Sequence, residues 1–280
     1  MTDPTASADE AAADRVLKSK HRAMWALGDY PSVASHVIPG LGAELVEACG
    51  VQRGDRVLDV GAGSGNAAIP AALAGADVVA SDLTPELLDV GREIAKVRGA
   101  RLDWREADAE ALPFADGEFD VVMSCVGIMF APHHQRAADE LVRVCRAGGT
   151  IGLANWTPQG FIGRMFATMK PYAPPPPPGA QPPPLWGDEE HVAALLGDRV
   201  IDIDARRRTV RVERFSQAED FREFFKATYG PTIAVYRAVA DDPDKVAALD
   251  RDLDGLAREH MAADGAMDWE YLLLTAHRRG

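Results

Sequence analysis

A glycine-rich turn between an apolar run and a helix-forming run constrains the fold of this chain most. The turn is Asp59-Val60-Gly61-Ala62-Gly63-Ser64-Gly65, and the apolar run 56–60 leads into it. Between a parallel strand and a helix, such a turn lets a nucleotide approach the backbone, because side chains at the glycine positions would collide with it. The pattern therefore predicts an α/β fold with a nucleotide-binding edge.

The acidic residue before the glycines separates two kinds of nucleotide. A carboxylate at Asp59 repels a pyrophosphate but suits a ligand with an ammonium group and no phosphate, such as S-adenosylmethionine. In the dinucleotide fingerprint G-x-G-x-x-G the third glycine would fall at position 66, where this chain has Asn66. An NAD-dependent oxidoreductase therefore fits poorly, and a tight turn without a ligand is the plain structural alternative.

Two further acidic residues lie at the ends of predicted strands. Asp82 ends the apolar run 76–82, about 20 residues beyond the glycines, where an acid can bind both ribose hydroxyls. Asp108 follows the strand-like run 101–105. Each acid alone is consistent with a strand-end cap, but three at these spacings favour an S-adenosylmethionine site.

Together these residues resemble the class I S-adenosylmethionine-dependent methyltransferases, whose motif is an acidic residue followed by G-x-G-x-G. The segment 106–114, followed by Phe119-Asp120-Val121-Val122, resembles the branch related to the ubiquinone and menaquinone biosynthesis C-methyltransferases. The resemblance covers residues 45–156 well and the rest of the chain loosely. It implies S-adenosyl-L-methionine as cofactor and S-adenosyl-L-homocysteine as product.

The resemblance also implies which residues hold the cofactor. Asp59 attracts its ammonium, the glycine backbone contacts its methionine part, and Asp82 accepts hydrogen bonds from the ribose. Leu83 flanks the adenine, Asp108 accepts from its exocyclic amine, and the Ala109 amide donates to a ring nitrogen. The full cofactor-binding set expected is Tyr30, Asp59, Gly61, Ala62, Gly63, Gly65, Asp82, Leu83, Asp108, Ala109 and Cys125.

Catalytic groups are less constrained by the sequence, because methyl transfer mainly requires alignment and a dry pocket. His133 and His134 begin a helix after the fourth predicted strand, where either could act as a base; capping the helix is the alternative. The N/D-P-P-Y/F motif of amino-methylating nucleobase enzymes is absent, since Ser124-Cys125-Val126-Gly127 occupies its place. No clustered histidine and carboxylate ligands suggest a metal site.

Strand-like and helical runs alternate from Arg56 to Trp156, which predicts a parallel, doubly wound α/β sheet with ligands at the carboxyl ends of its strands. By resemblance, the sheet is Rossmann-like and seven-stranded, and its last strand is antiparallel. The expected parts are a disordered start (1–14), a helical lid (15–50), the cofactor-binding core (51–156), a Pro-rich linker or lid (157–199), and C-terminal strands (200–280) with a helical acceptor-side insertion at 216–264.

Two segments outside the core have alternative interpretations. The proline tracts at 174–178 and 182–184 predict a stiff, extended segment. It forms either a rim over the acceptor pocket, with Tyr172 and Trp186 as aromatic contacts, or a rigid connector. The short basic cluster of Lys18, Lys20, His21 and Arg22 is expected to be a solvated helix face.

Composition argues against nucleic acid and anionic membranes as partners, and against zinc sites and disulfides. The net charge of −13 argues against a nucleic-acid backbone as partner and gives no reason to expect an anionic membrane. Three widely spaced cysteines indicate neither a zinc site nor a disulfide framework. The polar N-terminus lacks the apolar core of a signal peptide, so we expect a cytoplasmic protein, either a monomer or a homodimer.

These features predict an S-adenosylmethionine-dependent methyltransferase that acts on an oxygen or carbon atom of a moderately apolar small molecule, in biosynthetic or secondary metabolism. A protein-modifying methyltransferase would need an open acceptor groove. A cofactor-binding protein without transferase activity would carry the same motifs, so the sequence leaves that alternative open.

Overall fold

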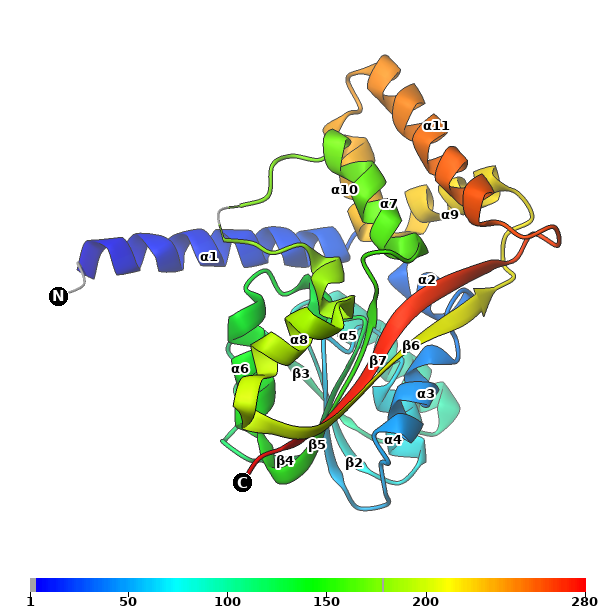
Figure 1. The fold of residues 1–280 in the computed structure, drawn as a ribbon. Coiled ribbons are helices and arrows are strands. Elements are labelled where there is room, and N and C mark those ends of the chain that lie inside the picture. The colour runs from blue at the N-terminus through cyan, green and yellow to red at the C-terminus, as the bar shows by residue number, and fades with distance from the viewer. Residues whose placement is uncertain (1–3, 178) are drawn as a thin grey trace.

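The computed structural model describes residues 4–177 and 179–280, and a seven-stranded sheet with the order β3-β2-β1-β4-β5-β7-β6 forms its centre (Figure 1). The strands are β1 (Arg56–Val60), β2 (Asp77–Asp82), β3 (Asp103–Glu106), β4 (Phe119–Cys125), β5 (Cys145–Trp156), β6 (Val200–Val212) and β7 (Met267–Arg278). Strands β1 to β5 pair in parallel, whereas β7 is antiparallel to both β5 and β6. The predicted sheet, including its antiparallel last strand, is confirmed.

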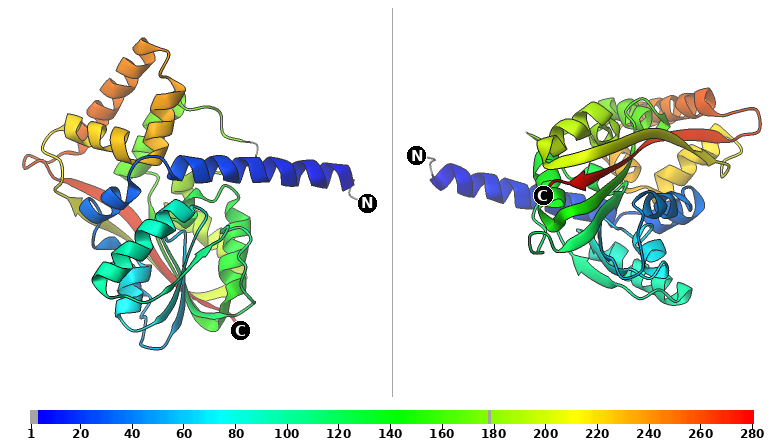
Figure 2. Two further views of the ribbon diagram at one scale, coloured as in Figure 1. Left: turned by 180° about the vertical axis from the view of Figure 1, so that it is seen from behind. Right: turned by 60° about the horizontal axis from the view of Figure 1, so that its bottom comes forward.

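Eleven α-helices in the described residues lie on both faces of this sheet and above it. They are α1 (Pro4–Trp25), α2 (Tyr30–His36), α3 (Leu41–Ala48), α4 (Ala68–Leu73), α5 (Pro85–Arg98), α6 (His134–Val144), α7 (Phe161–Met169), α8 (Glu189–Leu196), α9 (Ala218–Thr228), α10 (Gly230–Ala238) and α11 (Pro243–His260). Figures 1 and 2 show α3, α4 and α5 on one face and α6 and α8 on the other. Above the sheet, α7, α9, α10 and α11 form a separate helical layer. None of the helices in the described part of the chain is long and apolar enough to cross a membrane.

The prediction of a disordered start at 1–14 is wrong for residues 4–14, which form the first half of α1. Alanines at five positions give this stretch a high helix propensity, which outweighs its polar character. Residues 1–3 lie outside the described residues. Helix α1 extends sideways from the rest of the molecule, and its C-terminal half crosses the carboxyl edge of the sheet (Figure 1).

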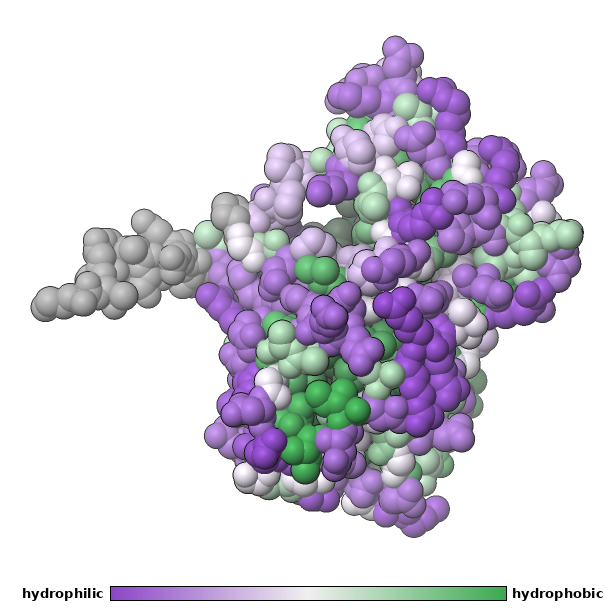
Figure 3. All heavy atoms as spheres, viewed as in Figure 1, coloured by the Kyte–Doolittle hydropathy of each residue, from purple (hydrophilic) through white to green (hydrophobic). Residues whose placement is uncertain are grey.

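The edge strand β6 carries arginines that are paired within the molecule. Arg208 donates to Glu44 of α3 at 2.9 Å, and Arg211 donates to Asp264 near the start of β7. Figure 3 shows hydrophilic side chains along this strand and a smaller apolar area low on the same face. Charged side chains on an edge strand oppose pairing with another sheet, so β6 ends the sheet.

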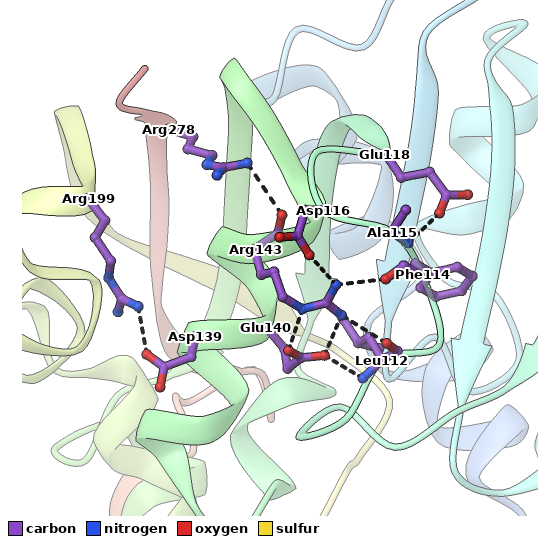
Figure 4. Close-up of polar contacts among 10 residues, drawn as sticks. All are labelled: Leu112, Phe114, Ala115, Asp116, Glu118, Asp139, Glu140, Arg143, Arg199 and Arg278. Atoms are coloured by element: carbon purple, nitrogen blue, oxygen red, sulfur yellow. Dashed lines mark hydrogen bonds and ion pairs between the residues drawn. The ribbon is translucent and has the colours of Figure 1, made fainter.

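Arg143 of α6 fixes the loop between β3 and β4 (Figure 4). Its guanidinium donates to the carbonyl of Phe114 at 2.7 Å and to the carbonyl of Leu112 at 2.9 Å. Glu140 accepts from Arg143 Nε at 2.7 Å and from the Leu112 amide at 2.6 Å. These contacts hold the irregular loop to a helix that is itself packed on the sheet.

The first prediction concerns this anchor. Arg143→Met keeps the aliphatic stem but leaves the Phe114 and Leu112 carbonyls without this donor and removes the cationic partner of Glu140, so we expect the unfolding free energy to fall by about 1–3 kcal/mol. Urea unfolding measures this change. Arg92→Met, which breaks an exposed pair with Asp89 on α5, is the matched control and should cost under about 0.5 kcal/mol. Equal losses in the two variants would contradict the anchoring role.

Candidate active site

A pocket opens at the carboxyl edge of the sheet, beside the glycine-rich turn and under α1. It is lined by Lys18, His21, Trp25, Tyr30, Gly61, Gly63, Asp82, Leu83, Thr84, Leu87, Ala107, Asp108, Ala109, Val126, Gly127, Phe130, Ala131 and Pro132. Most of the residues expected at the cofactor are among them. The four that do not line it are Asp59, Ala62, Gly65 and Cys125.

The glycine turn has both the conformation and the close contacts that require glycine. Gly61, Gly63 and Gly65 have φ values of 68°, 53° and 91°, in the left-handed region. A Cβ atom on Gly61 would lie 2.9 Å from Gly127 Cα, in the loop after β4. A Cβ atom on Gly63 would lie 3.4 Å from the ring of Tyr30. The bare backbone of the turn therefore forms the floor of the pocket.

Asp82 joins the end of β2 to this turn. Its Oδ2 accepts from the Gly63 amide at 2.8 Å, and its Oδ1 accepts from the Thr84 amide at 2.8 Å. Burial raises the pKa of Asp82, and the two backbone donors oppose that rise. A carboxylate offers about four lone-pair sites, so Asp82 can accept from ribose hydroxyls while it holds the turn.

Asp59 lies below the turn and is only 1% exposed. Its Oδ2 accepts from the Ala68 amide at 2.9 Å, whereas its Oδ1 has no partner among the described residues. Burial, together with the negative charge of Asp82, raises the pKa of Asp59 to about 8. Asp59 thus supports the turn from below, and its contact with the ammonium group of the cofactor stays a prediction.

Asp108 already has a cationic partner from α1. Lys18 Nζ lies 2.5 Å from Asp108 Oδ2, 2.9 Å from Asp14 and 3.0 Å from Glu110. Asp108 Oδ1 accepts from the Glu110 amide at 2.9 Å. Helix α1 is thereby fastened to the wall of the pocket, and the contact of Asp108 with an adenine amine stays a prediction.

The interpretation of Lys18 and His21 as a solvated helix face is wrong, because both line the pocket together with Trp25. The three residues are spaced three and four positions apart, which places them on one face of a helix. From this spacing alone, the three side chains could have been predicted to lie on the same face of the helix. Burial lowers the pKa of His21, and the charge of Glu110 counteracts this only in part.

His133 and His134 do not line the pocket. His133 contacts Glu110 through its amide at 2.7 Å and its ring Nδ1 at 2.9 Å. His134 is fully buried, with its Nδ1 2.9 Å from Nε2 of His191, and burial lowers the pKa of His134 to about 4. The expected role of either residue as a base in contact with the acceptor therefore does not fit this arrangement.

The aromatic residues of the Pro-rich segment also lie elsewhere. Trp186 is fully buried, and its ring lies 5.5 Å from that of His134. The Tyr172 hydroxyl donates to Asp252 of α11 at 2.5 Å. Cys125 is buried behind the pocket, and burial raises the pKa of its thiol. None of these three side chains lines the pocket or the cavity next to it.

A second cavity, here called the aromatic chamber, adjoins the pocket. The two share Tyr30, Val126 and Phe130, and the chamber is narrow, with a cavity volume of about 20 Å³. It is lined by Tyr30, Val33, Ile38, Val126, Phe130, Trp156, Ile162, Phe225, Tyr229 and Trp269. No lining residue carries a charge, so the wall of the pocket on this side is apolar.

Comparison with known proteins places the core in a described family. A model described as a methyltransferase domain matches residues 58–153. The uncharacterized protein Rv1403c of Mycobacterium tuberculosis is 54% identical over 258 residues, which cover 92% of this chain and 94% of that protein. The demethylmenaquinone methyltransferase of Renibacterium salmoninarum is 39% identical over 117 residues, which cover 42% of this chain and 48% of that protein.

Solved structures show the same fold at low sequence identity. The YcgJ protein of Bacillus subtilis has a TM-score of 0.58 and 15% identity, covering 85% of this chain and 98% of that one. A phosphoethanolamine N-methyltransferase of Haemonchus contortus, solved with S-adenosyl-L-methionine, has a TM-score of 0.53 and 18% identity. That match covers 85% of this chain and 52% of the other.

The second prediction follows from the buried carboxyl of Asp59. Its pKa rises from 3.8 to about 8 on folding, so between these values the folded protein binds more protons than the unfolded chain. The unfolding free energy of the cofactor-free protein should therefore fall with rising pH in this window, and Asp59→Asn should remove that fall. Urea unfolding at about pH 5 and about pH 8 measures the difference.

Asp103→Asn, at an exposed position of β3, is the control for the loss of one carboxylate. Curves of unfolding free energy against pH that run parallel for the native protein and Asp59→Asn would show that Asp59 is not held protonated.

The same cofactor is indicated by the sheet order, by the glycine turn with its acidic residues, and by the comparisons with known proteins. S-adenosyl-L-methionine is the cofactor of this fold, and the bare glycine backbone and the Asp82 carboxylate that line the pocket fit it. The chain belongs to the class I S-adenosylmethionine-dependent methyltransferases, and its core is similar to that of the demethylmenaquinone methyltransferases.

Proposed function

We propose that this protein transfers a methyl group to an oxygen or carbon atom of a moderately apolar small molecule, in biosynthetic or secondary metabolism in the cytoplasm. The observation that carries the proposal is the continuity of the pocket with the aromatic chamber through Tyr30, Val126 and Phe130. An apolar acceptor group that enters at these three residues lies next to the glycine turn, where the cofactor's methionine part is expected.

The cofactor brings a methyl group with a good leaving group, so the protein has to align the acceptor and exclude water. Alignment of two bound reactants is worth about 7–11 kcal/mol when the geometry is right. Asp82 and the glycine backbone fix the cofactor side of the site. Trp25 and Phe130, whose ring centroids lie 4.6 Å apart, close it against solvent.

Two alternative functions require different features of the site. A protein-modifying methyltransferase needs an open groove for a peptide, whereas the chamber is enclosed by residues of α2, α7, α9 and β7. A cofactor-binding protein without transferase activity would keep the pocket and need no chamber. We expect no nucleic-acid partner, given the net charge of −13.

The third prediction tests the proposal directly. The protein and its Asp82→Ala variant are incubated with methyl-labelled S-adenosylmethionine and a metabolite extract of the source cells. Label should enter the organic-soluble fraction with the native protein only. Calorimetry with S-adenosylhomocysteine should show a loss of affinity on the order of 100-fold in Asp82→Ala, because hydrogen bonds to a charged group are lost.

Each other outcome favours a different function. Label in the protein fraction supports protein modification. Absence of transfer by a protein that binds S-adenosylhomocysteine supports a binding role. Unchanged affinity in Asp82→Ala would mean that the ribose is held elsewhere, and Asp103→Asn is the control for the loss of a carboxylate.

A further inference from the structure

We infer that Lys18 of α1 competes with the cofactor for Asp108. The ammonium group of Lys18 and the exocyclic amine of adenine are alternative donors to this one carboxylate, so Lys18 lowers the affinity of the site for the adenine end of the cofactor. The inference concerns the cofactor side of the pocket and goes beyond the proposed function, because it holds for any methyl acceptor.

The sheet order places the adenine amine at Asp108. The glycine turn follows β1, Asp82 ends β2 and Asp108 follows β3, and these three strands are neighbours in the order β3-β2-β1. The Ala107 amide donates to the Asp82 carbonyl at 2.9 Å, which holds the segment after β3 beside the end of β2. The cofactor has its methionine part, its ribose and its adenine in the same sequence. With the methionine part at the glycine turn and the ribose at Asp82, the amine at the far end meets Asp108, the second carboxylate in the described lining of the pocket.

Lys18 already holds the oxygen of Asp108 that a ligand would use. Asp108 Oδ1 accepts from the Glu110 amide at 2.9 Å, and Lys18 Nζ lies 2.5 Å from Asp108 Oδ2. Burial alone would lower the pKa of Lys18, but hydrogen bonds with Asp108, Asp14 and Glu110 outweigh burial and raise it. Lys18 is therefore charged, and a charged donor binds a carboxylate more strongly than the neutral amine of adenine does.

The space in the pocket does not admit adenine beside Lys18. The pocket has a cavity volume of about 90 Å³, whereas sites that enclose small-molecule ligands have about 300–1,000 Å³. Lys18, His21 and Trp25 line it from α1, the helix that crosses the carboxyl edge of the sheet (Figure 1). An adenine at Asp108 therefore requires the side chain of Lys18 to move away.

A second carboxylate can receive Lys18 when it leaves Asp108. Lys18 Nζ lies 2.9 Å from Asp14 Oδ2, and Asp14 is four residues earlier on the same helix, so this pair moves as a unit with α1. The other oxygen of Asp14 has no hydrogen-bond partner among the described residues. Lys18 thus has two positions, one on Asp108 of the pocket wall and one on Asp14 of its own helix.

This exchange has a consequence for turnover. S-adenosylmethionine and the product S-adenosylhomocysteine carry the same adenine, so each has to displace Lys18 to bind. Return of Lys18 to Asp108 then favours departure of the product. Product release limits the rate of many enzymes, and weaker binding of the adenine end speeds that step.

The fourth prediction is a double-mutant cycle measured by calorimetry with S-adenosylhomocysteine, without an acceptor. Lys18→Met keeps the aliphatic stem and should bind S-adenosylhomocysteine about 5- to 10-fold more tightly than the native protein, because the ligand no longer breaks a hydrogen bond between charged groups. In the Asp108→Asn background, where that ion pair is already absent, Lys18→Met should change the affinity by less than about twofold.

A second ligand tests the position of the amine. The 6-deamino analogue of S-adenosylhomocysteine has hydrogen in place of the exocyclic amine. Lys18→Met should bind this analogue about 10-fold more weakly than S-adenosylhomocysteine, since the amine then donates to Asp108 without competition. Equal binding of the two ligands by Lys18→Met would show that the amine does not reach Asp108, which overturns the inference.

Two further variants of α1 complete the test. Arg22→Met removes the other pair that holds the helix, with Glu106, but leaves Asp108 untouched, and should change S-adenosylhomocysteine affinity by less than about twofold. Asp14→Asn, at the solvent side of the cluster, should weaken binding by about 2- to 5-fold, because Lys18 loses the carboxylate that receives it. This second variant tests the exchange even if Lys18→Met does not fold.

Four results would contradict the competition. They are weaker binding by Lys18→Met, an equal gain in the Asp108→Asn background, an equal gain in Arg22→Met, and unchanged or tighter binding by Asp14→Asn. The proposed function is judged separately by the transfer of label, since no acceptor enters these titrations.

Discussion

The two hydrogen bonds that Asp82 accepts at the end of β2 hold the site together. One comes from Gly63 in the glycine turn and the other from Thr84 at the start of α5, so a single carboxylate links the ends of two parallel strands and the helix that follows. Together with the hydrogen bond from the Ala62 amide to the Ser81 carbonyl, this anchor fixes the turn and its left-handed glycines against β2. The pocket floor, the edge shared with the aromatic chamber and the position of Tyr30 all depend on that link.

The walls of the site come from segments far from the core in sequence. Helix α1 supplies Lys18, His21 and Trp25 to the pocket. The end of α9 and strand β7 supply Phe225, Tyr229 and Trp269 to the chamber. Tyr30 lines both cavities. The core thus supplies the glycine turn and its acidic residues, and the two ends of the chain supply much of the remaining lining.

The sheet and its acids could be predicted because they depend on local signals. Thr84 and Pro85 begin α5 and Gly99 ends it in a left-handed conformation, as the residue types require. Three features could not be predicted, because each depends on how a helix packs onto the sheet. They are the place of Lys18 in the pocket lining, the burial of Trp186 and the burial of His134. The residue type limits the roles that a side chain can have, but tertiary packing decides whether the side chain contacts the ligand. His133 is an example, because its ring contacts Glu110 and does not line the pocket.

The ion pair between Lys18 and Asp108 makes one wall of the pocket electrostatic. A nucleoside that enters or leaves beneath α1 passes a helix held by Lys18 to the carboxylates at positions 108 and 110 and by Arg22 to Glu106. Added salt weakens such attractions, so the hold of α1 on the pocket wall depends on the ionic strength of its surroundings.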